Sequence, residues 1–300
     1  MKKIVKSGFI AAAVITEELY RYIFCRGGSP ILNRLFDKRG HEEGYYQFRD
    51  CSADKLRTAP QERFYLFSRR GCRLSGHYIS CGGDGRRIAF IVHGYRSEHA
   101  ETAGMFLDYY RSRGIDIFAP DNTAAGESEG HLIGFDVYES QDCLDWIDFL
   151  RHKFGEDVQI ILHGFSMGGA TVLKMSDKCP ENVKFIVSDS GYMDADSIFK
   201  ARLGILRNPM NLLNRLIAGY YMEETSTLPS LERSGKPILF VHGREDKTVR
   251  FSQGEELYAL YRGEKDCLFP ENTRHIESMY TSGDEYARKL DEFIEKYIRR

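Results

Sequence analysis

A serine framed by glycines carries the clearest chemical signal in the sequence. Ser166 stands in the run Gly-Phe-Ser-Met-Gly (164–168), directly after the apolar run 158–163 and directly before a helix-forming stretch. A sharp turn from strand to helix leaves no room for side chains beside the serine, and it lifts the hydroxyl clear of the sheet. The spacing therefore predicts a nucleophilic serine rather than the ordinary serine of a tight turn.

A serine nucleophile needs a base, and the base needs an acid that fixes its tautomer. His275 follows the last short strand-like run, and Asp246 follows the apolar run 238–242. Both come after predicted strands, in the chain order serine, acid, histidine that α/β sheets with this type of turn use. The alternatives for the acid are Asp189, at the end of an earlier strand-like run, and Glu245.

The negative charge that develops on the attacked carbonyl oxygen needs two N–H donors. The residue after the serine supplies one, which assigns it to the backbone N–H of Met167. The other comes from the loop after an earlier strand, where Gly94 permits a close approach and the N–H of Tyr95 is the candidate. His93 is predicted to be a structural hydrogen-bonding residue, since His275 already fills the role of base.

Alternating strand-like and helix-like segments provide the frame for these residues. From residue 63 onward, short β-branched or aromatic runs alternate with amphipathic stretches, which predicts a mostly parallel sheet covered by helices. The predicted strands are 64–68, 74–80, 87–93, 115–120, 158–163, 183–188, 238–242 and 265–269. The predicted helices are 100–113, 136–153, 169–178, 252–261 and 284–298.

Two segments depart from this alternation. Residues 1–62 show no strand alternation, and we expect a helical N-terminal extension. Residues 191–234 contain helical patches and no convincing strand, and we expect a small helical lid inserted into the domain of residues 63–300. A lid of this size predicts a modest cavity for short or medium acyl groups. The candidate substrate-binding residues are Arg96, Phe165, Tyr192 and Met193.

These motifs resemble those of the α/β-hydrolase superfamily over roughly residues 63–298. The His-Gly pair at 93–94 matches the family pattern together with the serine turn, the acid and the histidine. The run 121–128 resembles the Asp-x-Arg-Gly-x-Gly-x-Ser loop of Bem46-like bacterial serine hydrolases, although Thr123 replaces the arginine that braces that loop. The resemblance implies an α/β-hydrolase fold with a mostly parallel eight-stranded sheet. It also implies an esterase or a relative of prolyl-oligopeptidase-type peptidases.

The residues predict hydrolysis of a carboxylic ester through an acyl-enzyme, as in a carboxylesterase. One alternative is a peptidase or amidase for short peptides, with Arg96 anchoring a charged terminus, and another is a noncatalytic ligand-binding protein of the same fold. No cofactor is implied. No metal-binding motif is evident, because His163 and His242 lie inside apolar runs and are expected to be core histidines.

Composition narrows the partners. The 42 basic and 44 acidic residues give a net charge of −2, which offers no field for nucleic acid. The seven cysteines lie far apart and predict reduced thiols in the cytoplasm. The N-terminus joins Met1-Lys2-Lys3 to the apolar stretch 8–15, which predicts an amphipathic helix and a candidate for weak membrane contact. The oligomeric state is not indicated.

Overall fold

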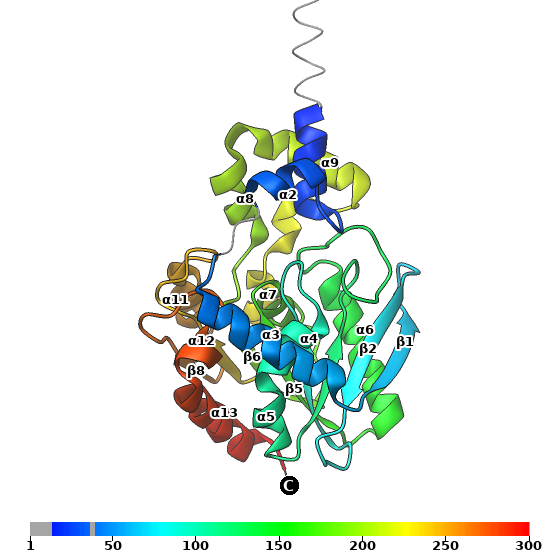
Figure 1. The fold of residues 1–300 in the computed structure, drawn as a ribbon, viewed down its shortest axis with the longest axis vertical. Coiled ribbons are helices and arrows are strands. Elements are labelled where there is room, and N and C mark those ends of the chain that lie inside the picture. The colour runs from blue at the N-terminus through cyan, green and yellow to red at the C-terminus, as the bar shows by residue number, and fades with distance from the viewer. Residues whose placement is uncertain (1–13, 37–39, 300) are drawn as a thin grey trace, which may run out of the picture.

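Eight strands form one sheet at the centre of the molecule (Figure 1). The computed structural model describes residues 14–36 and 40–299. The strands are β1 (Glu62–Phe67), β2 (Arg73–Ile79), β3 (Arg87–Val92), β4 (Asp116–Pro120), β5 (Gln159–Phe165), β6 (Val183–Asp189), β7 (Ile238–Val241) and β8 (Lys265–Leu268). β2 runs antiparallel to its neighbours β1 and β4, and all other pairs are parallel. The predicted mostly parallel, eight-stranded sheet is confirmed.

The order of the strands places a switch in winding direction at β3. The sheet runs β1-β2-β4-β3-β5-β6-β7-β8, so the chain adds β4 on one side of β3 and β5 on the other. Ligands of open α/β sheets bind at such a switch point, outside the carboxyl ends of the strands. Because β5 ends directly before Ser166, the predicted nucleophile lies at this point.

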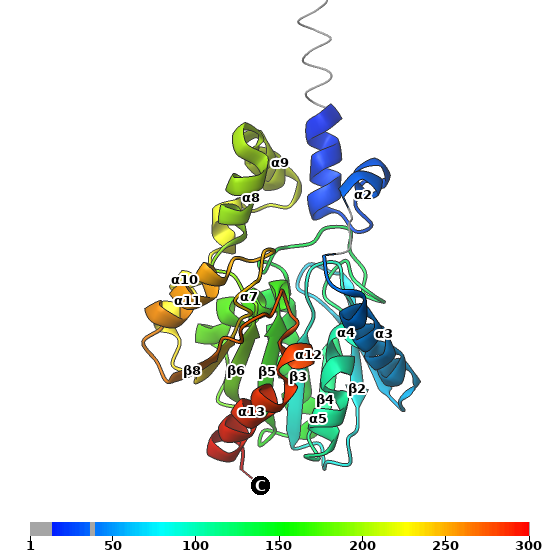
Figure 2. The same cartoon turned by 60° about the vertical axis from the view of Figure 1, so that its left-hand side comes forward.

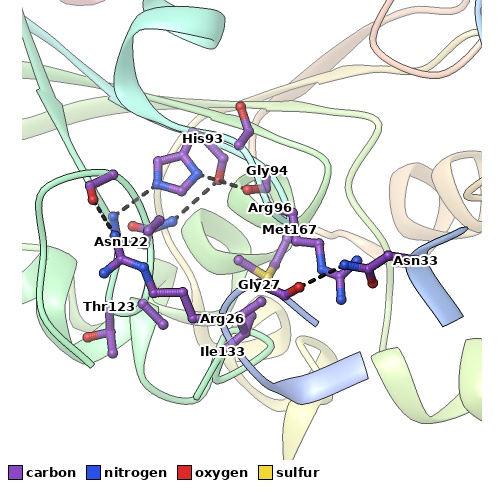
Figure 3. Close-up of a pocket in the computed structure, with 14 residues that line it drawn as sticks. Arg26, Gly27, Asn33, His93, Gly94, Arg96, Asn122, Thr123, Ile133 and Met167 are labelled. Carbon is purple, nitrogen blue, oxygen red and sulfur yellow. Dashed lines mark hydrogen bonds between the residues drawn. The ribbon is translucent and has the colours of Figure 1, made fainter. Parts of the chain in front are cut away.

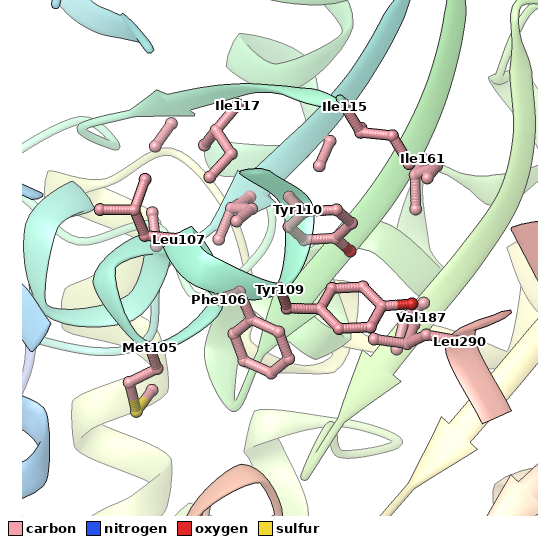
Figure 4. Close-up of a cluster of buried hydrophobic side chains, with 14 of the residues drawn as sticks. Met105, Phe106, Leu107, Tyr109, Tyr110, Ile115, Ile117, Ile161, Val187 and Leu290 are labelled. Carbon is pink, nitrogen blue, oxygen red and sulfur yellow. The ribbon is translucent and has the colours of Figure 1, made fainter. Parts of the chain in front are cut away.

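Helices cover both faces of the sheet, because successive side chains of a strand point to opposite faces. In β3, Ile88 and Phe90 pack into one buried cluster, and Ala89 and Ile91 pack into another. The first cluster is completed by α6 (Glu139–Phe154), α7 (Met167–Lys174), α10 (Leu228–Arg233) and α11 (Phe251–Leu260). The second cluster, shown in Figure 4, is completed by α3 (Glu43–Thr58), α4 (His99–Ala103), α5 (Leu107–Arg111) and α13 (Gly283–Tyr297). Two short helices, η2 (Ser176–Lys178) and α12 (Ser278–Thr281), precede β6 and α13.

The predicted helix 100–113 is divided in the structure. It consists of α4, the short helix η1 (Gly104–Phe106) and α5. At the division, Gly104 lies so close to α3 that a Cβ atom there would be 2.4 Å from the carbonyl oxygen of Ser52. The predicted helix therefore breaks where α3 crosses it. No local sequence pattern indicates this crossing.

The helix predicted to begin at residue 136 begins instead at Glu139. Phe135 and Asp136 have positive φ angles of 44° and 78°, which a continuing helix excludes. The buried carboxylate of Glu139 accepts hydrogen bonds from the backbone N–H groups of Gly134 and Asp136 and so holds this turn.

The remaining helices gather at one end of the molecule (Figure 1 and Figure 2). They are the N-terminal helix (residues 14–24), α2 (Pro30–Phe36), α8 (Ala195–Leu203), η3 (Gly204–Leu206), α9 (Arg207–Ile217) and η4 (Met222–Thr225). In their shared buried cluster, Phe24 packs against Phe135 and Phe199. We call residues 191–234 the insertion, since they lie between β6 and β7 and add no strand to the sheet. Among the described residues, no helix is both long and apolar enough to cross a bilayer.

Candidate active site

Ser166 lies on a strained turn between β5 and α7. Its backbone has φ 54° and ψ −116°, which residues with side chains rarely adopt. A Cβ atom on Gly164 would lie 2.1 Å from the carbonyl oxygen of Gly168, and one on Gly168 would lie 2.1 Å from that of Val92 in β3. The amide of Ser166 donates to the carbonyl oxygen of Asp189 in β6. The turn thus requires both glycines, as the sequence pattern predicts.

Three side chains from three strand ends form a hydrogen-bonded chain. The Nε2 atom of His275 lies 2.8 Å from the Oγ atom of Ser166. Its Nδ1 atom lies 2.6 Å from the Oδ2 atom of Asp246. Asp246 follows β7 and His275 follows β8, and both are buried. In this arrangement the imidazole can take the serine proton while the carboxylate keeps Nδ1 protonated.

The surroundings of Asp246 favour its ionised form. Burial acts to raise its pKa, but the neighbouring His275 and His242 outweigh that effect and hold the pKa well below its usual range. The Oδ1 atom accepts the backbone N–H groups of Thr248 and Val249. The Nε2 atom of His242 lies 3.3 Å from the Oδ2 atom. The buried His242, predicted only as a core histidine, therefore also contacts the acid of the site.

Of the three candidate acids, Asp246 is the one bonded to His275. Asp189 is buried at the end of β6 and accepts the hydroxyl of Ser190 at 2.9 Å. Burial raises the pKa of Asp189 to about 6. Glu245 is exposed to solvent. The position directly before Asp246 therefore faces away from the site.

The loop after β3 runs directly beside the serine. A Cβ atom on Gly94 would lie 3.3 Å from the Cβ atom of Ser166, so the close approach expected at this glycine is present. Met167 begins α7 and borders the same cavity as Ser166. Of the two residues predicted to supply N–H donors, Met167 directly follows the serine in the chain. Tyr95 directly follows Gly94, the residue that approaches the serine from the loop after β3.

Two loops near the serine brace each other. The Nδ1 atom of His93 lies 2.8 Å from the carbonyl oxygen of Gly94, and its Nε2 atom accepts the backbone N–H of Asn122 at 2.9 Å. Burial lowers the pKa of His93, which fits this structural role. Thr123 stands where the related loop has a bracing arginine. An arginine from another element contacts this position, since Arg70 in the β1–β2 link donates to the hydroxyl of Thr123 at 2.9 Å.

Within the described part of the chain, one group of three side chains has suitable atoms for a metal ion. His77, His99 and Asp121 are buried, and their ligand-type atoms lie within 4.8 Å of one another. The two imidazole rings stack 3.5 Å apart with only 7° between their planes, so their in-plane lone pairs do not converge on one point. Asp121 also accepts the backbone N–H of His99 at 3.0 Å. The group is therefore suited to hold the loop that begins at Asp121 rather than a metal.

A largely apolar cavity of about 780 Å³ borders Ser166. Its apolar lining comes from the N-terminal helix, the insertion and the loops of the sheet, and includes Leu19, Ile23, Phe135, Ile198, Phe199, Leu203 and Val249. Arg49, Arg96 and Arg202 also line it. Of the predicted substrate-binding residues, Arg96 and Tyr192 lie in this lining. The contribution of residues 19–23 has no counterpart in the sequence prediction.

The other two predicted substrate-binding residues are wrong. Phe165 is 1% exposed and packs against His163 and Phe106 in the core of the sheet. As a strand residue next to the serine, its side chain points to the face opposite the cavity. Met193 packs against the buried cluster under α6 and α7.

A smaller, more polar cavity of about 330 Å³ adjoins the first at Arg96 and Met167 (Figure 3). Arg26 and Asn33 from the N-terminal segment line it together with His93 and Asn122. The guanidinium of Arg26 donates to the carbonyl oxygens of Ser128 and Gly126. Polar groups therefore lie on one side of the serine turn and apolar groups on the other.

The mostly parallel sheet, the strained serine turn after β5, and the acid and histidine after β7 and β8 define an α/β hydrolase. The chain has the α/β-hydrolase fold. The family model that matches residues 83–229 is described as serine aminopeptidase, S33. The narrower resemblance to Bem46-like hydrolases stays a prediction.

The chain is also similar to known proteins in sequence and in fold. The chain is 24% identical over 297 residues to the uncharacterized protein YqkD of Bacillus subtilis (strain 168), covering 95% of this chain and 93% of that protein. It is 25% identical over 234 residues to the uncharacterized protein YfhR of Escherichia coli (strain K12), covering 75% and 77%. The fold is similar to that of the Pyrococcus furiosus esterase Pf2001, with a TM-score of 0.65, 19% identity, and coverage of 82% of this chain and 96% of that chain.

Proposed function

We propose that this α/β hydrolase is a serine esterase that cleaves carboxylic esters of short to medium acyl chain. The observation that carries the proposal is the hydrogen-bonded chain from Ser166 through His275 to Asp246 beside a largely apolar cavity. A hydroxyl on a strained turn, a base 2.8 Å away and a buried acid behind the base are the parts of an activated nucleophile. No cofactor enters the proposed reaction.

In the proposed reaction, the Oγ atom of Ser166 attacks the ester carbonyl carbon while the Nε2 atom of His275 takes the hydroxyl proton. The backbone N–H groups of Tyr95 and Met167 stabilise the oxyanion, and Asp246 stabilises the imidazolium. The tetrahedral intermediate expels the alcohol, which receives its proton from His275, and leaves an acyl-enzyme. The same histidine then deprotonates a water molecule that releases the carboxylic acid.

The two cavities support a division of the substrate. The larger, apolar cavity of about 780 Å³ suits the acyl group, since its lining combines aliphatic and aromatic side chains. The smaller cavity, with Arg26 and Asn33, suits a polar alcohol group. Because residues of the insertion and of the N-terminal helix line the larger cavity, we expect it to accept acyl groups only up to a medium length.

A peptidase or amidase acting on short peptides is the second candidate. Arg96 borders both cavities, and a guanidinium there suits the carboxylate of a peptide terminus. The description of the matching family model, serine aminopeptidase, supports the same candidate. A noncatalytic ligand-binding role has less support, because none of the three residues of the hydrogen-bonded chain is lost.

Labelling with a fluorophosphonate probe tests the proposed nucleophile. We expect the native protein to be labelled and the Ser166→Ala variant to remain unlabelled, with kcat for p-nitrophenyl esters reduced by about 10⁴-fold or more. A series of p-nitrophenyl esters of increasing acyl length and a matched series of p-nitroanilides then separate esterase from amidase activity. A folded native protein that neither reacts with the probe nor turns over either series would contradict the proposal.

The proposed enzyme is cytoplasmic, with membrane contact through its N-terminal segment. The cysteines support the first part, since none of the seven is bonded to another. Cell fractionation with an antibody against the native protein tests both parts.

A further inference from the structure

Exposed aliphatic side chains are concentrated at one end of the molecule. Those on the N-terminal helix, α2, η3 and α9 are Val14, Ile15, Ile31, Leu35, Ile205, Leu212, Leu216 and Ile217. Elsewhere in the described residues, Leu260 is the one large aliphatic side chain classed as exposed. Figure 1 and Figure 2 show the four elements at the same end in both views. We call these eight residues the apolar end face; concentrations of this kind mark contact with a partner or a membrane.

Helix α9 exposes leucines on its outer side, while Met210 and Leu213 of the same helix pack against the protein. Asn214 is fully buried and donates to the carbonyl oxygen of Tyr220, and Asn211 accepts the backbone N–H of Met222. Leu212 and Leu216, by contrast, are 57% and 75% exposed. An ordinary surface helix buries its leucines and exposes mainly polar side chains. The leucines of α9 are therefore placed to be buried against another apolar surface.

The same end carries an excess of positive charge. Residues 14–36 and 195–217 contain seven basic and three acidic residues, and η4 adds Glu223 and Glu224, so basic residues outnumber acidic ones here although the whole chain has a net charge of −2. Arg34 and Arg202 form no ion pair with any described residue. Arg215 donates to the carbonyl oxygen of Gly219 rather than to a carboxylate. Basic side chains among aliphatic ones complement a surface where anionic headgroups cover acyl chains.

The N-terminal helix carries part of the apolar end face and also lines the larger cavity, and α8, which lines this cavity as well, directly precedes η3 and α9. Leu19 and Ile23 of the N-terminal helix line this cavity from one side, and Ile198 and Leu203 of α8 line it from the other. A surface bound at this end would therefore lie over the walls of the apolar cavity. The acyl chains of a bilayer are apolar like the lining of that cavity, whereas the surface of a typical protein partner is polar.

We propose that the apolar end face docks on a bilayer that contains anionic phospholipids. The leucines of α9 and the aliphatic residues of η3 and the N-terminal segment enter the boundary between headgroups and acyl chains, and the arginines contact the headgroups. Such a contact combines buried apolar area with electrostatic attraction and needs no spanning helix. It does not depend on catalysis, so it stands apart from the proposed esterase activity.

Co-sedimentation of the full chain with phosphatidylcholine vesicles, with and without phosphatidylglycerol, tests this docking. We expect binding to the vesicles with phosphatidylglycerol and weaker binding as salt is raised. The double variant Leu212→Ser/Leu216→Ser is expected to lower the binding constant by about tenfold or more. The matched variant Leu260→Ser, at an exposed leucine of α11, is expected to bind like the native protein. Arg34→Gln is expected to weaken binding to the anionic vesicles by about fivefold.

Circular dichroism verifies that each variant is folded. The Ser166→Ala variant is expected to bind vesicles like the native protein, which separates docking from the proposed chemistry. Native protein that remains in the supernatant with both vesicle types would overturn the docking. So would a double variant that binds unchanged, or light scattering that shows the two leucines joining copies of this chain instead.

Discussion

At the scale of single residues, the surroundings shift the pKa values of buried carboxyl groups in opposite directions. Asp246 is stabilised as an anion, because two backbone N–H groups and two histidines surround it. Asp189 and Glu139 are buried with less compensation, and burial raises their pKa to about 6 and about 7. Asp246, unlike Asp189 and Glu139, is supplied with enough donors to stay ionised. The contrast supports Asp246, rather than Asp189, as the acid of the proposed mechanism.

The raised pKa of Asp189 predicts a pH-dependent contribution to stability. Folded Asp189 keeps its proton up to a pH of about 6, whereas the unfolded chain releases it near the ordinary aspartate pKa of 3.8. The folded state therefore binds more protons in this window, and stability falls as pH rises through it. Asp189→Asn mimics the protonated side chain, so its free energy of unfolding, relative to that of the native protein, should rise by about 1 kcal/mol between pH 5 and pH 8.

Urea unfolding at several pH values measures this difference. Asp84→Asn changes an exposed aspartate and serves as the control. Parallel curves for the native protein and Asp189→Asn across the whole range would show that Asp189 titrates normally in the folded state.

At the scale of elements, the serine turn depends on contact among neighbouring strands and the helix that follows. β5 and α7 meet at Gly164 and Gly168, and α7 presses on the end of β3 at Val92. The same contact sets the N-terminus of α7 beside the loop after β3 at Gly94. Positioning of the hydroxyl and stability of the sheet are therefore properties of one packed unit.

The packing of this turn gives a prediction for stability. In Gly168→Ala, the new methyl group would lie 2.1 Å from the carbonyl oxygen of Val92, so β3 or α7 must move. We expect the free energy of unfolding to fall by about 3 kcal/mol. Gly235→Ala is the control, since nothing lies within 4 Å of the added methyl group and its φ angle is not positive. Equal urea midpoints for the two variants would contradict the close packing.

The elements also show which features the sequence could predict. All eight strands form within two residues of their predicted ends, because β-branched runs and their alternation are local patterns. The residues of the hydrogen-bonded chain were likewise accessible, since their order and strand-end positions are encoded along the chain. The break at Gly104 and the brace from Arg70 were not accessible, because both depend on segments that meet only after folding. The outward leucines of α9 were missed because amphipathicity alone does not tell which side faces the core.

At the scale of the whole molecule, two segments distant in the chain close one cavity. The hydroxyl of Tyr20 in the N-terminal helix donates to Asn214 of α9 at 3.3 Å, and the hydroxyl of Tyr95 donates to the carbonyl oxygen of Ile23 at 2.8 Å. These contacts join the N-terminal helix to the insertion and to the loop after β3. The size of the proposed acyl site is therefore set by how the N-terminal segment, the insertion and the sheet fit together.

This arrangement predicts that either wall of the cavity can limit acyl length. Ile23→Trp narrows the cavity from the N-terminal helix, and Leu203→Trp narrows it from α8. For each variant we expect kcat/KM for the longest accepted p-nitrophenyl ester to fall by about tenfold or more, while the acetate ester changes by less than about twofold, because only the long chain reaches the added ring. Ile31→Trp, at an exposed position of α2 outside the cavity lining, controls for the added bulk. If only Leu203→Trp shifted the profile, the insertion alone would form the acyl site, and the N-terminal helix would serve the proposed docking surface rather than the substrate.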